Sequence, residues 1–246
     1  MKTWVTILAL GCAAWQANGQ AVLPPNIRAT NTLERLQDVD RMGISDVLYG
    51  IPLPEGKVIG NTYINPQWQQ CTILLYENSK LVEGYPVRYD LYLEELEISG
   101  RSGIRVLRGE KIKSFVWIEA STGQPEYFVN GKELSSPSHA YDGFFKVLAE
   151  GARPLFERIE LNIKKADYNI QFNVGSVDDK ILKKSEFYTQ VDGELIQLPS
   201  SRKKLLNVFA GKNDEMGSFM KQNHIAANNG ESLKLAFRHY NNLIGK

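Results

Sequence analysis

The stretch SSPSHAYDGFF gathers the side-chain types that nucleophilic catalysis would need. Ser135, Ser136 and Ser138 are candidate nucleophiles, His139 is a candidate base, and Asp142 could orient that base. Serine hydrolases bring such groups together from distant segments and hold the serine on a strained turn, often within Gly-x-Ser-x-Gly. This stretch lacks that motif, and its composition is typical of a polar loop after a hairpin. The sequence therefore favours a structural role for it.

The histidines and cysteines do not have the spacing of a metal site. His139, His224 and His239 are far apart in the sequence, and neither His-Glu-x-x-His nor a cysteine pair is present. Cys71 stands at the entry to an apolar run, where a small buried thiol is the ordinary role. No phosphate loop or dinucleotide fingerprint occurs. The sequence predicts no metal and no cofactor.

Two charged runs allow a sharper and a plainer interpretation. Glu94, Glu95 and Glu97 could supply the paired carboxylates of a glycoside hydrolase, but neighbouring acids in one strand or turn are usually solvated surface. The basic run SRKKLL, residues 201–206, could contact nucleic acid, but it is typical of a solvent-facing helix start. The plainer interpretation is favoured for both runs.

The N-terminus has the pattern of an export signal. Lys2 precedes a short apolar run, Trp4 to Trp15, which is shorter than the roughly 20 residues that span a bilayer. We expect residues 1–19 to be a signal peptide, and the small residues before the cut favour cleavage after Gly19, with Gln20 as the new N-terminus. The alternative is a lipobox ending at Cys12, whose acylation would anchor the chain in a membrane.

The composition of the mature chain limits its partners. Cleavage after Gly19 removes one lysine and no acid, so Lys+Arg falls from 29 to 28 and equals the 28 acidic residues. A chain without net charge has no global field to attract nucleic acid, so no nucleic-acid partner is expected. Only Cys71 then remains, which leaves no internal disulfide. No later stretch is long and apolar enough to cross a membrane.

The periodicity of the sequence predicts three regions after the signal peptide. Residues 20–60 read as a leader with one short amphipathic helix at TLERLQDVDRM. Residues 61–198 have the alternating pattern and turn residues of an antiparallel β domain. Residues 199–246 show three short helical stripes that must pack on the sheet to be stable. The predicted fold class is α+β, mainly β: a twisted antiparallel sheet, or a partly closed barrel or sandwich, with C-terminal helices packed on it.

Several turns and one buried strand can be placed within the β domain. Asn130-Gly131 and Asp192-Gly193 are the dipeptides of two-residue hairpin turns. A change of parity at Glu94-Glu95 requires either a bulge or a tight turn, and the sequence leaves both open. Residues 115–118 are apolar on both parities, so we expect this strand to be covered on both faces, with the C-terminal helices docked over it.

Aromatic residues are concentrated on consecutive predicted strands. They could line a concave face that holds a ligand, although an aromatic core between sheet and helices is favoured. The residues concerned are Tyr85, Tyr89, Tyr92, Phe115, Trp117, Tyr127 and Phe128.

A succession of motifs runs from about Gly60 to Leu243: GNTYINPQWQQ, YPVRYDLYLEELEI, KIKSFVW, GFFKVLAEG, FYTQVDGELIQL, SRKKLLNVFAGKNDEMGSFMKQNHI and LKLAFRHYNNL. In this order they resemble uncharacterised secreted envelope proteins of Bacteroidota-type bacteria. The resemblance implies a location and an architecture, and it carries no catalytic residues to this chain.

The sequence as a whole favours a non-catalytic exported protein of the periplasm, the outer membrane or the cell exterior. It would act as a binding or assembly module on an envelope protein or an outer-membrane component. The alternatives are a hydrolase of polysaccharide, peptide or lipid, with a site joining His139 to distant acids, and a carrier with an apolar cavity for a small ligand.

Overall fold

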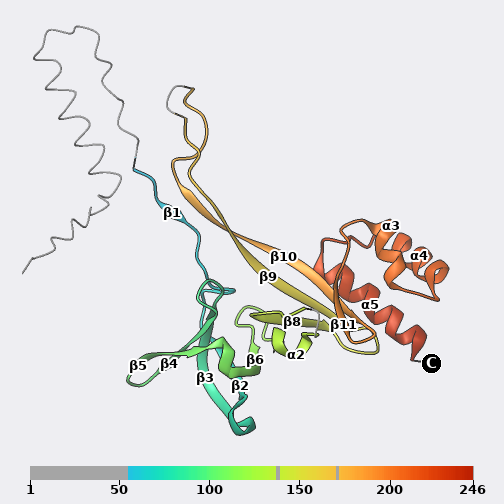
Figure 1. Ribbon diagram of the computed structural model, residues 1–246, viewed down its shortest axis with the longest axis horizontal. Coiled ribbons are helices and arrows are strands. Elements are labelled where there is room, and N and C mark those ends of the chain that lie inside the picture. The colour runs from blue at the N-terminus through green and yellow to red at the C-terminus, as the bar shows by residue number, and fades with distance from the viewer. Residues whose placement is uncertain (1–54, 137–138, 170–171, 246) are drawn as a thin grey trace, which may run out of the picture. The chain divides into compact units, whose positions relative to one another are not determined.

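The computed structural model describes residues 55–136, 139–169 and 172–245 (Figure 1). The expected signal peptide, its cleavage site at Gly19 and Gln20, the alternative lipid site at Cys12, and the helix expected near residues 32–42 lie outside the described residues. Residue 138 of the serine-rich stretch is also outside them.

Eleven strands form one sheet in the order β1-β10-β9-β8-β7-β6-β2-β3-β4-β5, with β11 also paired to β10. All neighbouring strands are antiparallel except β1 and β10. The strands are β1 (Val58–Ile59), β2 (Gln69–Leu75), β3 (Leu81–Asp90), β4 (Glu95–Gly100), β5 (Gly103–Arg108), β6 (Ile112–Ile118), β7 (Pro125–Asn130), β8 (Phe144–Ala149), β9 (Leu155–Lys164), β10 (Asp179–Val191) and β11 (Glu194–Gln197).

Short helices interrupt the sheet and follow it. They are η1 (Glu77–Ser79), η2 (Gly109–Lys111), α2 (Gly131–Leu134), α3 (Arg202–Leu205), η3 (Leu206–Val208), α4 (Asn213–Gln222) and α5 (Gly230–Ile244). The predicted class, α+β and mainly β with C-terminal helices packed on the sheet, is confirmed. Within the described residues the sheet ends at β5 on one side and at β1 on the other, so it is twisted and unclosed.

One aromatic core lies on β2, β3, β4, β6 and β7. Phe115 stacks on Phe128 with ring centroids 4.6 Å apart, and Trp117 meets Phe128 edge-on at 4.7 Å. Alternate residues of these strands share this face, which is why the period-two pattern of the sequence buries them together. Tyr89 joins the same core, whereas Tyr85, Tyr92 and Tyr127 are exposed. The aromatic set is therefore divided between core and surface.

The C-terminal helices bury their apolar stripes against a different part of the sheet. Phe237 of α5 packs in one cluster with Leu155 of β9 and Phe187 of β10. The prediction that the helices cover residues 115–118 was wrong. Phe115 and Trp117 face the aromatic core instead, and Ile118 remains 44% exposed. The second face of this strand is thus only partly covered, with Val116 half-buried and Ile118 exposed.

Local turn chemistry was decisive at one predicted hairpin and was overridden at the other. Asp192 and Gly193 both have positive φ and join β10 to β11, as predicted. The Asn130-Gly131 hairpin was a wrong prediction. Asn130 has φ −65°, and its side-chain oxygen caps α2 by accepting from the Lys132 amide at 3.0 Å. Its side-chain NH2 group donates to the carbonyl oxygens of Gly109 and Ile112, at 3.1 and 2.8 Å, and so holds this conformation.

The sequence left open whether a bulge or a tight turn lies at Glu94-Glu95, and the structure has a turn there. Residues 91–94 form a turn, and Tyr89 pairs with Leu96 across it. β3 does contain a bulge, at Gly84, because Cys71 pairs with Tyr85 while the next residue of β2 pairs with Glu83. Gly84 has φ +76°, a left-handed conformation that favours glycine.

Candidate functional site

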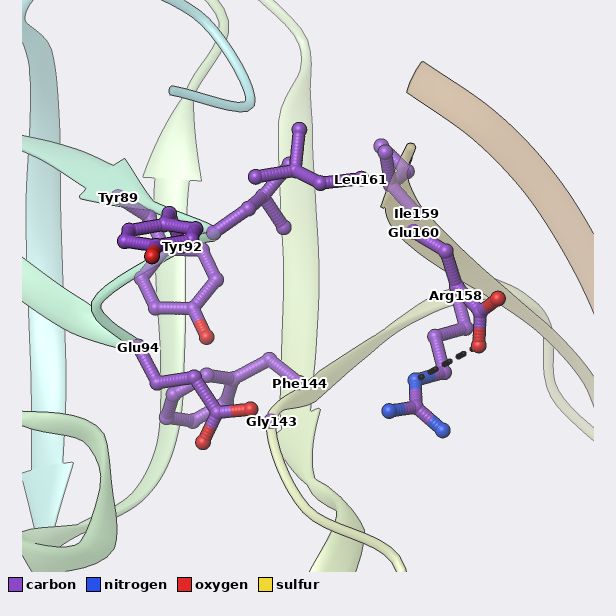
Figure 2. A pocket seen from close by; sticks show the side chains of 10 residues that line it. Tyr89, Tyr92, Glu94, Gly143, Phe144, Arg158, Ile159, Glu160 and Leu161 are labelled. Atoms are coloured by element: carbon purple, nitrogen blue, oxygen red, sulfur yellow. Dashed lines mark ion pairs between the residues drawn. The ribbon is translucent and has the colours of Figure 1, made fainter. Parts of the chain in front are cut away.

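A hollow of about 260 Å³ lies between the β3–β4 turn and β9 (Figure 2). The two sides come from segments far apart in the strand order, with the start of β8 between them. Its lining residues are Tyr89, Leu91, Tyr92, Glu94, Gly143, Phe144, Arg158, Ile159, Glu160 and Leu161.

Asp90 builds the turn that forms one wall. Its buried carboxylate accepts hydrogen bonds from the amides of Tyr92 and Leu93, at 2.8 and 3.1 Å, and from the Thr62 hydroxyl at 2.6 Å. An aspartate that bonds to amides two and three residues ahead is a standard way to fix a tight turn. The turn exposes Tyr92 and Leu93, whose accessible fractions are 65% and 59%.

Glu94 is held in a conformation that side chains rarely adopt. Its φ is +53°, which costs about 1–3 kcal/mol for a residue with a Cβ. The amide of Gly109 donates to the Glu94 carbonyl oxygen at 2.8 Å, and a Cβ on Gly109 would lie 2.7 Å from that oxygen. The glycine therefore permits the close approach that holds Glu94. The Glu94 carboxylate lies beside Gly143, since a Cβ there would be 3.4 Å from its Oε1.

Tyr89 lies at the floor of the hollow. Its ring is fully buried and meets Phe144 edge-on with centroids 5.2 Å apart. Burial raises the pKa of the Tyr89 phenol, the nearby Glu94 charge raises it further, and the Arg158 charge opposes this. The hydroxyl therefore keeps its proton at neutral pH and can serve as a hydrogen-bond donor.

Arg158 and Glu160 stand on the opposite wall from Glu94 (Figure 2). Residues two apart in a strand share a face, and the Arg158 Nε lies 3.7 Å from the Glu160 Oε1. The guanidinium also covers the Phe145 ring at 5.6 Å. A half-exposed ion pair of this length contributes at most about 1 kcal/mol, so both groups are available to a ligand at little cost.

The backbone of β9 is unpaired along this hollow. β9 pairs with β10 over its whole length, but it pairs with β8 only from Leu155 to Glu157. Hydrogen-bonding direction alternates along an antiparallel strand. The Leu198 amide donates to the Phe187 carbonyl oxygen at 2.7 Å, so the odd-numbered residues of β10 turn their backbone groups toward β11 and the even-numbered ones toward β9. Even-numbered residues of β10 pair with even-numbered residues of β9. The odd-numbered residues of β9 therefore turn their amides and carbonyls toward the open edge: Ile159, Leu161 and Ile163.

Among the described residues, the serine and histidine candidates Ser135, Ser136 and His139 are not assembled into a catalytic group. The Ser135 hydroxyl donates to the Gly131 carbonyl at 2.9 Å and accepts from the Tyr141 amide at 2.9 Å, so it holds its own loop. Ser136 and His139 form a backbone bridge, and the His139 side chain is exposed. None of the lining residues of the hollow comes from this group; Asp142 lines a smaller neighbouring hollow of about 190 Å³.

The other candidate residues have structural surroundings. Cys71 is buried, and burial raises the pKa of its thiol to about 12. His239 stacks on Phe219 with ring centroids 3.8 Å apart. Within the described ranges, no three His, Cys, Asp or Glu side chains come together in a way that could hold a metal ion. Over the same part of the chain, no helix combines the length and apolar character that a membrane crossing requires.

The acidic run is split by the turn. Glu94 faces the hollow, whereas the Glu97 carboxylate accepts from Arg88 Nε at 2.6 Å and from the Tyr63 hydroxyl at 2.9 Å. Glu95 lies opposite Arg108 on β5. The Arg88 guanidinium is also flanked by two aromatic rings, so this group stabilises the outer face of β3 and β4.

Sequence reasoning missed Arg158, Glu160 and the open edge of β9. The signal for the open edge was the difference in strand length: β8 has 6 residues and β9 has 10, so β8 is too short to pair with all of β9. No protein-family model, curated protein or solved structure matches this chain.

Proposed function

We propose that this protein is a non-catalytic exported envelope protein that acts as a binding or assembly module. The open edge of β9 receives an extended segment of a partner protein, which pairs with Ile159, Leu161 and Ile163 in the line of β8. The observation that carries the proposal is the loss of the β8 partner after Glu157, at the place where a hollow separates β9 from the β3–β4 turn.

The chemistry of the hollow supports binding of a chain. Unpaired strand edges are templates for added strands, and main-chain hydrogen bonds supply affinity in such complexes. Tyr92 and Leu93 add exposed apolar surface beside the edge, while Tyr89 can donate one hydrogen bond from the floor. The strained Glu94 is consistent with a functional position, because such conformations cluster at binding sites.

Photo-crosslinking from the turn tests this proposal. Benzoylphenylalanine in place of Tyr92 is expected to form one dominant protein adduct in intact envelopes, because this position overlooks the β9 edge. The matched control is the same replacement at Ile118, an exposed apolar position at the end of β6. Equal adducts from both positions, or none from Tyr92, would contradict the proposal.

A proline substitution in β9 then tests whether binding depends on the backbone amides of the edge or on the side chains around it. Leu161→Pro removes an amide that points to the open edge and leaves the β10 ladder intact, so the Tyr92 adduct should disappear while the fold persists. Leu161→Thr keeps the amide and should keep the adduct. Survival of the adduct in a folded Leu161→Pro protein would show that β9 does not pair with the partner.

A further inference from the structure

A separate hollow of about 530 Å³ lies between the β10–β11 hairpin and the segment that contains α3 and η3. Its walls are mainly aliphatic and include Val191, Ile196, Pro199 and Val208. It shares no lining residue with the hollow beside β9. A ligand bound here would therefore be recognised independently of the proposed strand pairing.

Arg153 lines this hollow and also carries a buried donor without a partner. Its Nε is buried and has no hydrogen-bond partner among the described residues. A buried polar group without a partner costs about 1–3 kcal/mol, and more when it is charged, so each such group calls for an explanation. Because the Nε itself has almost no accessible surface, an anion in the hollow would meet the terminal nitrogens of the guanidinium instead.

The position of Arg153 is fixed by the C-terminal helix. Asn241 of α5 accepts a hydrogen bond from the Arg153 amide at 2.9 Å and donates to its carbonyl oxygen at 2.9 Å. The same side chain donates to the Glu150 carbonyl oxygen at 3.0 Å. This clamp holds the β8–β9 loop against α5. The guanidinium is thus carried by a restrained backbone and not by a free surface loop.

Two of the lining residues are cationic, Arg153 and Lys204, and no acidic residue lines the hollow. In the part of the chain that the structure describes, neither of these two side chains forms an ion pair. A small inorganic anion would engage these cations alone and leave the aliphatic walls in contact with water.

We infer that this hollow binds an amphiphile that has an anionic head and an aliphatic chain, of the fatty-acid class. The carboxylate accepts hydrogen bonds from Arg153 and Lys204, and the chain lies against Val191, Ile196 and Val208. Charge-assisted bonds to guanidinium provide the head-group recognition, and removal of apolar surface from water provides the remaining affinity.

The binding test uses the full chain and the fluorescent fatty acid cis-parinarate. The wild-type protein should raise its fluorescence, dodecanoate should displace it, and dodecanol should not. Arg153→Gln should weaken binding by about tenfold to a hundredfold, which corresponds to the loss of hydrogen bonds to a charged group. Ile196→Glu should weaken it as well, because the new carboxylate repels the head group.

The matched control is Arg202→Gln, which removes a cation that does not line the hollow, from α3, the short helix that carries Lys204. It should bind cis-parinarate as the wild type does. Equal loss in Arg202→Gln and Arg153→Gln would show only general attraction by basic residues and would overturn the inference. Thermal melting checks that each variant is folded, and Ile196→Glu tests the site should Arg153→Gln fail to fold.

A membrane surface presents the same chemistry, so phosphatidylglycerol vesicles form a second arm. Binding of monomeric dodecanoate with 1:1 saturation supports a site for a single amphiphile. Binding to the vesicles without any binding of dodecanoate would instead identify a surface contact with lipid head groups and overturn the inference. Failure of strand pairing at β9 would leave either result unchanged, because the two sites have no residue in common.

Discussion

At the scale of single residues, the best-defined constraint in the sheet is a buried amide. Asn130 is 3% exposed; its side chain donates to Gly109 and Ile112 and accepts from the Lys132 amide at 3.0 Å. It thus ties the end of β7 to η2 and to the start of β6. This one side chain satisfies backbone groups of three elements.

Asn130→Asp should lower the free energy of unfolding by about 2–4 kcal/mol. The new carboxylate would place an acceptor opposite two carbonyl oxygens and lose both donated hydrogen bonds, in a place that excludes water. Urea denaturation measures this loss. Asn228→Asp, at an exposed position, is the control and should stay within about 0.5 kcal/mol of the wild type. Equal effects would show that the Asn130 bonds contribute nothing.

Burial should make the Cys71 thiol slow to react. Its pKa is raised to about 12, against about 8.5 in an open chain, so the thiolate fraction at pH 8 falls by about a thousandfold. In a Cys12→Ser variant, iodoacetamide should label the folded protein far more slowly than the urea-unfolded protein. Similar rates in both states would contradict the burial of this thiol.

The same raised pKa predicts weaker stability in alkali. Above about pH 8.5 the unfolded chain releases the thiol proton while the folded chain keeps it. The free energy of unfolding therefore decreases as the pH rises toward about 12. Burial also raises the pKa of Tyr188 to about 12, which adds a loss of the same sign above pH 10. The midpoint of urea unfolding should therefore fall from pH 9 to 11. A midpoint that rises over this range would contradict it.

At the scale of elements, β5 is a terminal strand with an exposed edge. Ile104 and Val106 are more than half exposed on it, yet Arg101, Arg105 and Arg108 lie on or beside the same strand. Two antiparallel copies of such an edge would bring arginines together, and charges of this kind protect edges from self-pairing. The arginines therefore act against association of β5 with itself.

Replacing Arg105 and Arg108 with valine should promote self-association. The double variant removes the repulsion and lengthens the apolar edge, so light scattering should show oligomers at concentrations where the wild type shows none. The control is Lys183→Val with Lys184→Val on β10, which removes as many cations from a different strand. An unchanged mass of the Arg105/Arg108 variant would mean that β5 does not pair with itself even without the charges.

The sequence correctly predicted elements that depend only on the preferences of neighbouring residues. Asp192-Gly193 forms the predicted hairpin because both residues tolerate positive φ and nothing else competes for them. Asn130-Gly131 has the same local preference, but its side chain finds carbonyl oxygens about twenty residues away along the chain, and those bonds prevail. Short-range turn preferences hold until a buried partner from another segment offers more.

Pairings between distant segments were beyond the sequence. The hydrophobic stripe of α5 indicates that it packs, but not that Phe237 packs on β9 and β10 and leaves Ile118 exposed. The candidate site depends on such pairings as well. Its Glu94 was singled out as one of three acids and as part of a bulge or turn, but its opposite wall at Arg158 follows from the register of β9 with its neighbours.

At the scale of the whole described region, the sheet ends at β5 and at β1, and it also opens between its ends, along β9. Arginines protect the β5 edge, whereas three aliphatic residues of β9 turn their amides outward. The first edge is defended by charge. The second adjoins a hollow that carries a strained glutamate and exposed aromatic surface. This contrast is the basis for assigning binding to β9 and not to β5.

Amide hydrogen exchange along β9, measured residue by residue by NMR, tests the open edge most directly. The amides of Ile159, Leu161 and Ile163 should exchange rapidly in the free protein, while those of Arg158, Glu160 and Asn162, which face β10, should be protected. Addition of the partner protein identified by crosslinking should slow the exchange of the first set of amides and leave that of the second set unchanged. Equal protection of both sets in the free protein would mean that β9 is already paired on both sides, and would contradict the account.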